Sequence, residues 1–260
     1  MSYSRIQLDI SEGIATLTLN HPASRNALSW AMAEEIGDAL DRLSGARVLV
    51  LRSEGKAFCS GGDMASAVPE GLDFGQMLYN GITRAVNPML LKLANLDVPV
   101  IASVNGAAAG AGAPLALLAD FVIAADSAFF YLAFTNVGLA VDAGGSFLLP
   151  RLIGTARAMR MMMLAERVSA AQAEEWGMIY KAVPDDQLAG ETATLAARLA
   201  SGPSLAYGLI RRNVRLGLEG DFATTLQNEA VAQGIAGSSK DCGEAVAAFL
   251  EKRSPVFRGA

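Results

Sequence analysis

Hydrophobic and polar residues alternate along the first twenty positions, and then the period changes. Apolar residues occupy every second position over residues 6–10, residues 12–13 form a Glu-Gly turn signal, and alternation resumes over residues 14–19. This pattern predicts a β-hairpin, because successive side chains of a strand point to opposite faces. From about 30 to 43 the apolar positions recur at helical spacing behind Ser29, which predicts a capped helix.

Further along, continuous apolar runs alternate with helical patterns. The runs at 48–51, 98–104 and 121–125 predict buried parallel strands. Two segments are predicted as helices: residues 74–94, with a break near Pro88, and a segment that ends at Leu118. Repeated strand, loop and helix segments predict an α/β spiral, and nearly everything after about residue 143 has helical character. We therefore expect a core over residues 1–200 and a C-terminal helical module over residues 201–260, which packs on the core or on a neighbouring subunit.

Composition narrows the classes of protein that fit. The chain has 260 residues, 52% of them hydrophobic, and a net charge of −5 without a dense basic run, which argues against nucleic-acid binding. Its two cysteines lack metal-ligand spacing, so we expect no metal site and no disulfide-forming compartment. Residues 98–119 carry no charge, yet their prolines, glycines and asparagine favour a buried strand, loop and helix over a membrane span. With no apolar leader before the first strand, a cytoplasmic protein is expected.

Few side chains are suited to nucleophilic catalysis. His21 is the single histidine, so no Ser–His–Asp triad can be built without it, and its place beside Pro22 favours a structural role. Cys59 has no second histidine to activate it and is interpreted as a small apolar filler. The methionines at 159 and 161–163 are either core residues or the lining of an acyl tunnel.

Two loops rich in small residues offer backbone chemistry instead. Residues 106–114 lack the third glycine of a dinucleotide fingerprint, and the chain has no P-loop motif. Small side chains there, and in residues 56–64, let backbone N–H groups approach a ligand closely. Two such donors from separate loops can hold an oxyanion, and each is typically worth about 3 kcal/mol in a transition state. Taken singly, either loop is explained equally well as a tight turn.

Several motifs in order resemble the crotonase superfamily, the enoyl-CoA hydratase/isomerase enzymes. The matching segments are Asn20-His21-Pro22, 25–28, Lys56-Ala57-Phe58-Cys59-Ser60-Gly61-Gly62-Asp63, 99–112, Ala119-Asp120, Gly138-Leu139, Gly144-Gly145-Ser146, Leu149-Pro150-Arg151 and Gly154. The resemblance implies a spiral of ββα turns, a trimer or a dimer of trimers, and an acyl-CoA thioester as substrate, as in fatty acid metabolism. It implies no cofactor beyond the coenzyme A that the substrate itself carries.

The same resemblance assigns candidate site residues. The amides of Gly62 and Ala111 are expected to form the oxyanion hole, with slight crowding from the alanine methyl group. The residues expected to bind coenzyme A are Arg25, Ala27, Leu28, Ala57, Ser60, Gly61, Asp63, Met64, Lys252 and Phe257. For Asp63 and Asp120 a role as loop or helix caps is the alternative, and for Lys252 and Phe257 a solvated helix end.

The carboxylates distinguish between reactions of the family. Hydratases that resemble this chain use two glutamates, and the matching positions hold Pro114 and Phe134, which cannot transfer protons. Asp142 instead matches the catalytic carboxylate of enoyl-CoA isomerases, and its surroundings are especially similar to the bacterial isomerase of ring-epoxidised phenylacetyl-CoA. We therefore predict an enoyl-CoA isomerase with Asp142 as the base. The apolar residues near Asp142 are expected to raise its pKa. The alternatives are a hydratase, a non-catalytic acyl-CoA-binding protein, or an Asp142 that merely caps a helix.

Overall fold

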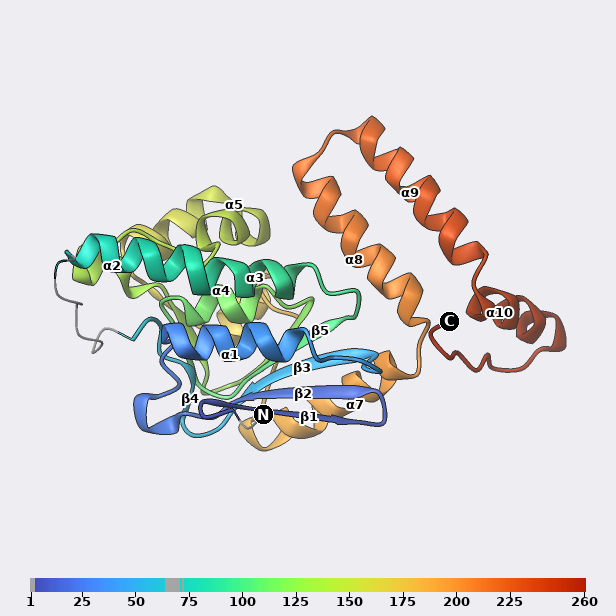
Figure 1. The fold of residues 1–260 in the computed structure, drawn as a ribbon, viewed down its shortest axis with the longest axis horizontal. Helices are drawn as coiled ribbons and strands as arrows, with labels where there is room; N and C mark the ends of the chain where they lie inside the picture. The colour runs from blue at the N-terminus through green and yellow to red at the C-terminus, as the bar shows by residue number, and fades with distance from the viewer. Residues whose placement is uncertain (1–2, 64–70, 72) are drawn as a thin grey trace.

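The computed structural model describes residues 3–63, 71 and 73–260, and its described strands form two sheets (Figure 1). The six-stranded sheet has the order β1 (Ile6–Ser11), β2 (Ile14–Leu19), β3 (Val48–Ser53), β5 (Val100–Val104), β7 (Phe121–Ala125) and β10 (Lys181–Val183). The four-stranded sheet has the order β4 (Ala57–Cys59), β6 (Ala107–Ala109), β8 (Phe129–Tyr131) and β9 (Arg167–Ser169). Only the hairpin β1–β2 and the pair β8–β9 are antiparallel among these described pairings.

From β3 to β8, consecutive strands go alternately to the two sheets, and a helical segment follows each pair. β3, β5 and β7 join the large sheet, whereas β4, β6 and β8 join the small one. The helical segments that follow are α2 (Phe74–Gly81) to α3 (Asn87–Ala94), α4 (Gly112–Leu117), and α5 (Gly145–Met163). The expected α/β spiral of ββα turns is therefore confirmed.

The helices begin where the sequence predicts, with differences at their ends. The hydroxyl of Ser29 accepts a hydrogen bond from the Met32 N–H and caps α1 (Trp30–Leu40). The predicted break near Pro88 is instead a π-helical segment, η2 (Ile82–Val86). Pro88 itself is the second residue of α3, directly after this π-helical segment.

The C-terminal part of the chain contains more than helices. The helices are α6 (Ala170–Glu175), α7 (Leu188–Ala200), α8 (Ser204–Glu219), α9 (Phe222–Gly237) and α10 (Lys240–Glu251). The expectation that nearly everything after about residue 143 is helical did not identify β9 and β10, because three residues are too few to show an alternating pattern. α7 packs against the large sheet through β3, β5 and β7, whereas α8, α9 and α10 project from the body as an arm (Figure 1).

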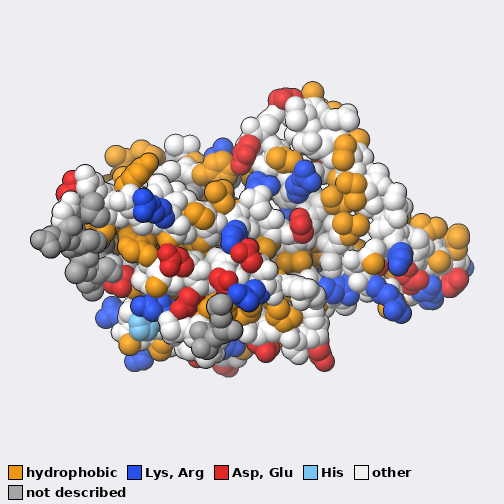
Figure 2. All heavy atoms as spheres, viewed as in Figure 1, with side chains coloured by type: hydrophobic (Ala, Val, Ile, Leu, Met, Phe, Trp, Pro, Cys, Tyr) orange, Lys and Arg blue, Asp and Glu red, His pale blue; other side chains and the backbone are white. Residues whose placement is uncertain are grey.

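Exposed hydrophobic side chains gather on this arm. Figure 2 shows them along α8 and α9, whereas basic and acidic side chains are interspersed over the same face of the body. The large exposed hydrophobic residues of the arm are Ile210, Val214, Leu218, Phe222, Leu226, Val231, Ile235, Val246, Phe249 and Leu250. A large exposed apolar area of this kind marks a contact surface.

Two expectations about other apolar segments can be compared directly with the structure. Met161 is fully buried, as expected of a core residue, whereas Met159 and Met163 are exposed. The uncharged stretch 98–119 forms β5, β6 and α4. Among the helices of the described residues, none has the length and apolar character that crossing a membrane requires. Nor do those residues include a group of acidic, histidine and cysteine side chains placed to hold a metal ion.

Candidate functional site

The two glycine-containing loops meet at the edge where β4 and β6 end. β4 and β6 are parallel neighbours, so the loops that follow them leave from the same edge of the small sheet. Gly61 and Gly110 have φ of +98° and +50°, a backbone region that glycine adopts without a steric penalty. A Cβ atom on Gly61 would lie 3.1 Å from the Ala109 carbonyl oxygen and 3.2 Å from the Gly110 Cα. The loops are therefore in direct contact, and neither glycine can be enlarged without separating them.

The two predicted donors, Gly62 and Ala111, directly follow these contact residues. Ala111 is the residue before α4, with φ of −61°. Within the described part of the chain, neither N–H donates to a backbone carbonyl. No atom of the described residues lies within 4 Å of the position that a Cβ atom on Gly62 would take. Each loop thus leaves a backbone donor available to an acceptor that is not part of the chain.

Residues 25–28 are joined to the first of these loops by backbone hydrogen bonds. The Leu28 N–H donates to the Gly61 carbonyl at 2.7 Å, and the Ser60 N–H donates to the Arg25 carbonyl at 3.1 Å. Leu28 and Gly62 also form a parallel bridge. The structure therefore brings together the predicted coenzyme residues Arg25, Ala27, Leu28, Ala57, Ser60, Gly61 and Asp63. Met64, which was predicted with them, lies outside the described residues.

Asn26 holds this arrangement together, a role that sequence reasoning did not assign to it. Its side chain is 0% exposed. Its Oδ1 accepts from the His21 N–H at 2.8 Å, and its Nδ2 donates to the carbonyls of Glu54 and Ala57 at 2.8 and 2.9 Å. Asparagine also tolerates the left-handed backbone found here, with φ of +54°. An asparagine in a polar loop was the available signal, but its partners lie too far along the chain to be inferred.

Asp142 is a half-buried residue whose carboxyl group has an incomplete set of partners among the described residues. Its Oδ1 is shielded from solvent and has no hydrogen-bond partner among the described residues. Burial raises the pKa of Asp142 from 3.8 to about 6, because the charged form loses its hydration. Gly144, not Asp142, precedes α5, and no side chain caps that helix. The alternative that Asp142 serves as a helix cap is therefore wrong.

The Asp142 loop packs against the first turn of α4. A Cβ atom on Gly145 would lie 2.6 Å from Val141 Cγ1 and 3.2 Å from Pro114 Cγ. This contact places the loop against the helix that Ala111 precedes. Pro114 and Phe134, at the positions of the hydratase glutamates, are both buried. The contact between this loop and α4 is consequently apolar at Val141 and Pro114.

Cys59 and Asp120 have structural surroundings. Burial raises the pKa of the Cys59 thiol to about 11, so it stays protonated, and its side chain packs where a Cβ on Gly112 would stand. The Asp120 carboxylate pairs with the Arg211 guanidinium at 2.6 Å and accepts from the Val100 N–H at 2.7 Å. Both observations favour the structural alternatives for these residues.

Lys252 and Phe257 lie apart from the other predicted coenzyme residues. The Phe257 carbonyl accepts from Arg47 Nη1 at 3.2 Å, and the tail after it is held by the Asp241 carboxylate. In Figure 1, α10 and the C-terminus lie at the opposite end of the molecule from β4. One copy of the chain therefore does not bring these two residues to the contact between the loops.

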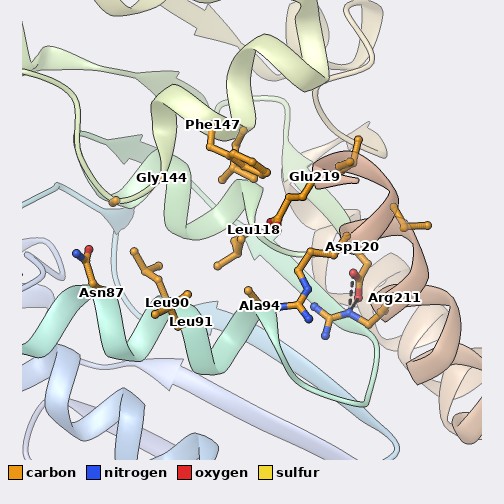
Figure 3. Close-up of a pocket in the computed structure, with 15 residues that line it drawn as sticks. Asn87, Leu90, Leu91, Ala94, Leu118, Asp120, Gly144, Phe147, Arg211 and Glu219 are labelled. Atoms are coloured by element: carbon orange, nitrogen blue, oxygen red, sulfur yellow. Dashed lines mark hydrogen bonds and ion pairs between the residues drawn. The ribbon is translucent and has the colours of Figure 1, made fainter. Parts of the chain in front are cut away.

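A cavity of about 490 Å³ opens beside the Asp142 loop. Its lining comes from α3, the end of α4, the start of α5 and α8, and it includes Ala143 and Gly144, the two residues after Asp142. Figure 3 shows Leu90 on α3, Phe147 on α5 and Leu118 facing this space, with the Asp120–Arg211 ion pair at the side of α8. The carboxyl-bearing loop therefore adjoins a largely apolar hollow.

Comparisons with known proteins agree with this architecture. The profile of the enoyl-CoA hydratase/isomerase family matches residues 9–260. The chain is 46% identical over 260 residues to a probable enoyl-CoA hydratase of Rhodobacter capsulatus, with 100% of both chains covered. It is 42% identical over 253 residues to the 1,2-epoxyphenylacetyl-CoA isomerase of Escherichia coli, covering 96% of this chain and 97% of that relative.

Two further similarities extend the range of relatives. A trans-2-decenoyl-[acyl-carrier-protein] isomerase of Streptococcus mutans is 37% identical over 268 residues, with 100% of both chains covered. The crystal structure of a putative enoyl-CoA hydratase from Streptomyces coelicolor A3(2) superposes with a TM-score of 0.93 at 36% identity, covering 100% of this chain and 96% of that one. Relatives named as hydratases and as isomerases are thus both similar to this chain over nearly its full length.

Proposed function

The chain belongs to the enoyl-CoA hydratase/isomerase family, and from this premise we propose that it is an enoyl-CoA isomerase that shifts a carbon–carbon double bond within an acyl-CoA thioester. The observation that carries the proposal is the half-buried Asp142 carboxyl group, whose pKa is raised and whose shielded Oδ1 has no hydrogen-bond partner among the described residues. Pro114 and Phe134 leave the two-glutamate route of hydration without its proton-transfer groups. Isomerisation needs only a single base.

In the proposed mechanism the Asp142 carboxylate removes a proton from carbon two of a 3-enoyl thioester. The electron pair of the broken C–H bond passes to a dienolate whose negative charge lies on the thioester oxygen. The same carboxyl group then returns the proton to carbon four, and the double bond ends between carbons two and three. A pKa of about 6 suits both steps, because the group must be ionised to accept the proton and must release it again.

The N–H groups of Gly62 and Ala111 are the proposed oxyanion donors. Support comes from the direct contact of Gly61 with Gly110, since each donor is one residue beyond that contact. Neither N–H has a backbone acceptor within the described residues. A preorganised pair of donors stabilises the dienolate more than the neutral thioester, which lowers the barrier to proton removal.

We further propose that the coenzyme A portion of the substrate lies along residues 25–28 and 57–63, and that the reaction needs no other cofactor. A homo-oligomer, a trimer or a pair of trimers, is proposed on the basis of the exposed apolar side chains of α8 to α10. Within such an assembly, Lys252 and Phe257 of one copy are proposed to reach the coenzyme bound to another. Sedimentation of the intact protein tests the oligomeric state.

A hydratase is the second candidate, because a relative with 46% identity is named a probable enoyl-CoA hydratase. On this hypothesis Asp142 alone would activate water for addition to a 2-enoyl thioester. Parallel assays with matched 3-enoyl and 2-enoyl substrates separate the two activities. A protein that binds coenzyme A thioesters and turns over neither substrate would instead be a non-catalytic binder.

The decisive experiment measures conversion of a 3-enoyl-CoA by the wild type, by Asp142→Asn and by Asp126→Asn. Asp126 is an exposed aspartate at the end of β7 and serves as the matched control. We expect Asp142→Asn to lower kcat by about 10² to 10⁴, the usual contribution of a positioned proton-transfer group, and the control to retain its rate. Equal rates for the wild type and Asp142→Asn would remove Asp142 from the mechanism.

A further inference from the structure

The two strands that lead to the proposed donors begin at a hydrogen bond between Asn105 and Gly55. Asn105 Nδ2 donates to the Gly55 carbonyl at 2.8 Å. Two residues further along each segment, Ala57 begins β4 and Ala107 begins β6, and these two residues are paired with each other. The Asn105 side chain therefore joins the two strands at the point where their pairing starts.

The amide group of Asn105 is held in one orientation by Ser53. The Ser53 hydroxyl donates to Asn105 Oδ1 at 2.7 Å, which leaves Nδ2 directed at Gly55. Ser53 is the last residue of β3 and is buried. The backbones also approach closely here, because a Cβ atom on Gly106 would overlap the Lys56 carbonyl. The beginning of the β4–β6 pair is thus fixed by side-chain and by backbone contacts.

The pairing of β4 with β6 shifts by one residue after this point. Ala57 pairs with Ala107, whereas Cys59 pairs with Ala108, so β4 uses one residue more than β6 over this step. The extra residue is Phe58, which is fully buried in the core. An extra residue of this kind redirects the chain beyond it, and a buried side chain fixes where it occurs.

This shift makes the two proposed donor residues level with each other. Continued along both segments, the shifted pairing places Gly61 level with Gly110 and Gly62 level with Ala111. The 3.2 Å between a Cβ atom on Gly61 and the Gly110 Cα supports this alignment. A strand advances about 3.3 Å per residue, so a slip of one residue would move one N–H by that distance relative to the other. Two donors so displaced no longer meet at a single oxygen atom.

We propose that Asn105 is a positioning residue of the oxyanion hole, because its hydrogen bond to Gly55 fixes the register that brings the Gly62 and Ala111 N–H groups to one oxygen atom. The inference rests on the proposed function and deepens it. Asn105 acts through the backbone of Gly55 and not by contact with the thioester. An asparagine suits this place because a single short side chain supplies both the acceptor for Ser53 and the donor for Gly55.

The test compares Asn105→Asp with Asn95→Asp. Aspartate has the size of asparagine and keeps the acceptor that faces Ser53, but it presents an oxygen to the Gly55 carbonyl in place of a donor. Asn95 is the matched control, because its Nδ2 also donates to a backbone carbonyl, that of Leu91 at 2.7 Å, at the end of α3. Urea unfolding of each variant establishes that it is folded under the assay conditions.

Two measurements report on the donors themselves. The first is kcat for a 3-enoyl-CoA. The second is the infrared stretching frequency of the thioester carbonyl in bound hexanoyl-CoA that carries an isotopic label at its carbonyl carbon. Hydrogen bonds to the oxygen weaken the C=O bond and lower this frequency, and hexanoyl-CoA has no double bond to shift. A residue that only stabilised the fold would not change the carbonyl frequency in a protein that remains folded.

For Asn105→Asp we expect kcat to fall by about 10- to 100-fold, less than the complete loss of a donor causes, and the carbonyl frequency to rise above its wild-type value. Asn95→Asp should keep both wild-type values.

Ser53 supplies a second pair of variants. Ser53→Ala removes the hydroxyl that orients Asn105, so both readouts should change in the same direction as in Asn105→Asp. Ser53→Thr keeps the hydroxyl, and its added methyl group has room because Ser53 lines a cavity of about 480 Å³ beside α7. This conservative variant should therefore restore the wild-type rate and frequency.

Wild-type values of kcat and carbonyl frequency in Asn105→Asp would overturn the inference, and so would an equal change in Asn95→Asp. If Asn105→Asp does not fold, the Ser53 variants decide, and equal values for Ser53→Ala and Ser53→Thr would overturn the inference. Each of these results leaves the proposed function standing. A wild type that converts no 3-enoyl-CoA, or that does not lower the carbonyl frequency below its value in water, would instead contradict the proposed function itself.

Discussion

Replacing Asp142 by asparagine is expected to stabilise the folded protein at neutral pH even though it removes the proposed base. Burial raises the pKa of this carboxyl group from 3.8 to about 6, so the folded state holds a charge that it solvates poorly. Each unit of pKa shift corresponds to about 1.4 kcal/mol, which gives an upper limit of about 3 kcal/mol for the cost of that charge. Solvent screening lowers this figure, and the new amide gains two donors without evident partners, so we expect a net gain of about 1 to 2 kcal/mol.

The gain has a defined pH dependence. A carboxyl group whose pKa is higher in the folded state binds its proton first in the folded state as the pH falls. Above pH 6 the carboxyl group is ionised in both states and the full penalty applies. Between pH 6 and pH 4 the folded protein takes up the proton and the penalty shrinks, and below about pH 4 it disappears. The advantage of Asp142→Asn should therefore be present at pH 7.5 and nearly absent at pH 4.

Urea unfolding at both pH values measures this difference, with all proteins at the same concentration. Asp126→Asn again serves as the control, because it removes an exposed carboxylate of the same size. An Asp142→Asn protein that is no more stable than the wild type at pH 7.5 would refute the argument. A stability difference of the same size at both pH values would also refute it, because the difference would then come from packing and not from the charge of Asp142. Wild-type kcat should also fall as the pH drops through about 6, as Asp142 loses its basic form.

Two other substitutions test the loops around the site. Asn26→Ala removes three hydrogen bonds of a fully buried side chain. Each is worth about 1 kcal/mol, with an added cost for the groups left unpaired, so urea unfolding should show that the free energy of unfolding falls by about 2 to 4 kcal/mol. A fall of less than about 1 kcal/mol would contradict the role given to Asn26. Ala111→Pro fits the observed φ of −61° but removes the N–H, so kcat should fall by about 10² to 10³. The control Ala111→Gly keeps the N–H donor and should keep the rate. Full activity in the proline variant, with its fold intact by circular dichroism, would exclude the Ala111 N–H as an oxyanion donor.

The regular part of the fold could be predicted from local pattern alone. The hairpin β1–β2 and the buried strands β3, β5 and β7 were identified because five or six apolar or alternating residues make a clear signal. α1 was predicted with its cap because Ser29 precedes a helical stripe of apolar residues. These elements form five of the six strands of the large sheet and one covering helix, which support the site without lining it.

The elements that form the site were harder to predict. β4, β6 and β8 have three residues each and lie in segments rich in small residues, so their pattern resembles that of a loop. Asn26 shows a second reason, because its partners Glu54 and Ala57 lie 28 and 31 residues away. Such contacts depend on tertiary structure and leave no periodic trace in the sequence. The candidate site residues were therefore found by resemblance to the crotonase superfamily, and the direct contact of Gly61 with Gly110 supplies the physical reason for their grouping.

The replacement of the hydratase glutamates and the burial of Asp142 are best understood as one feature of the structure. Pro114 occupies the first turn of α4, where it costs no hydrogen bond, and its ring packs beside Val141 and the α-carbon of Gly145. A glutamate at that position would bring a second carboxylate toward Asp142, and two neighbouring carboxylates oppose each other's ionisation. The proline instead adds apolar surface next to Val141, the residue before Asp142, and loss of hydration is what raises the pKa of Asp142. In the proposed isomerase, the proline that leaves the two-glutamate route without a proton-transfer group therefore also keeps a second carboxylate away from the group proposed to accept and return the proton.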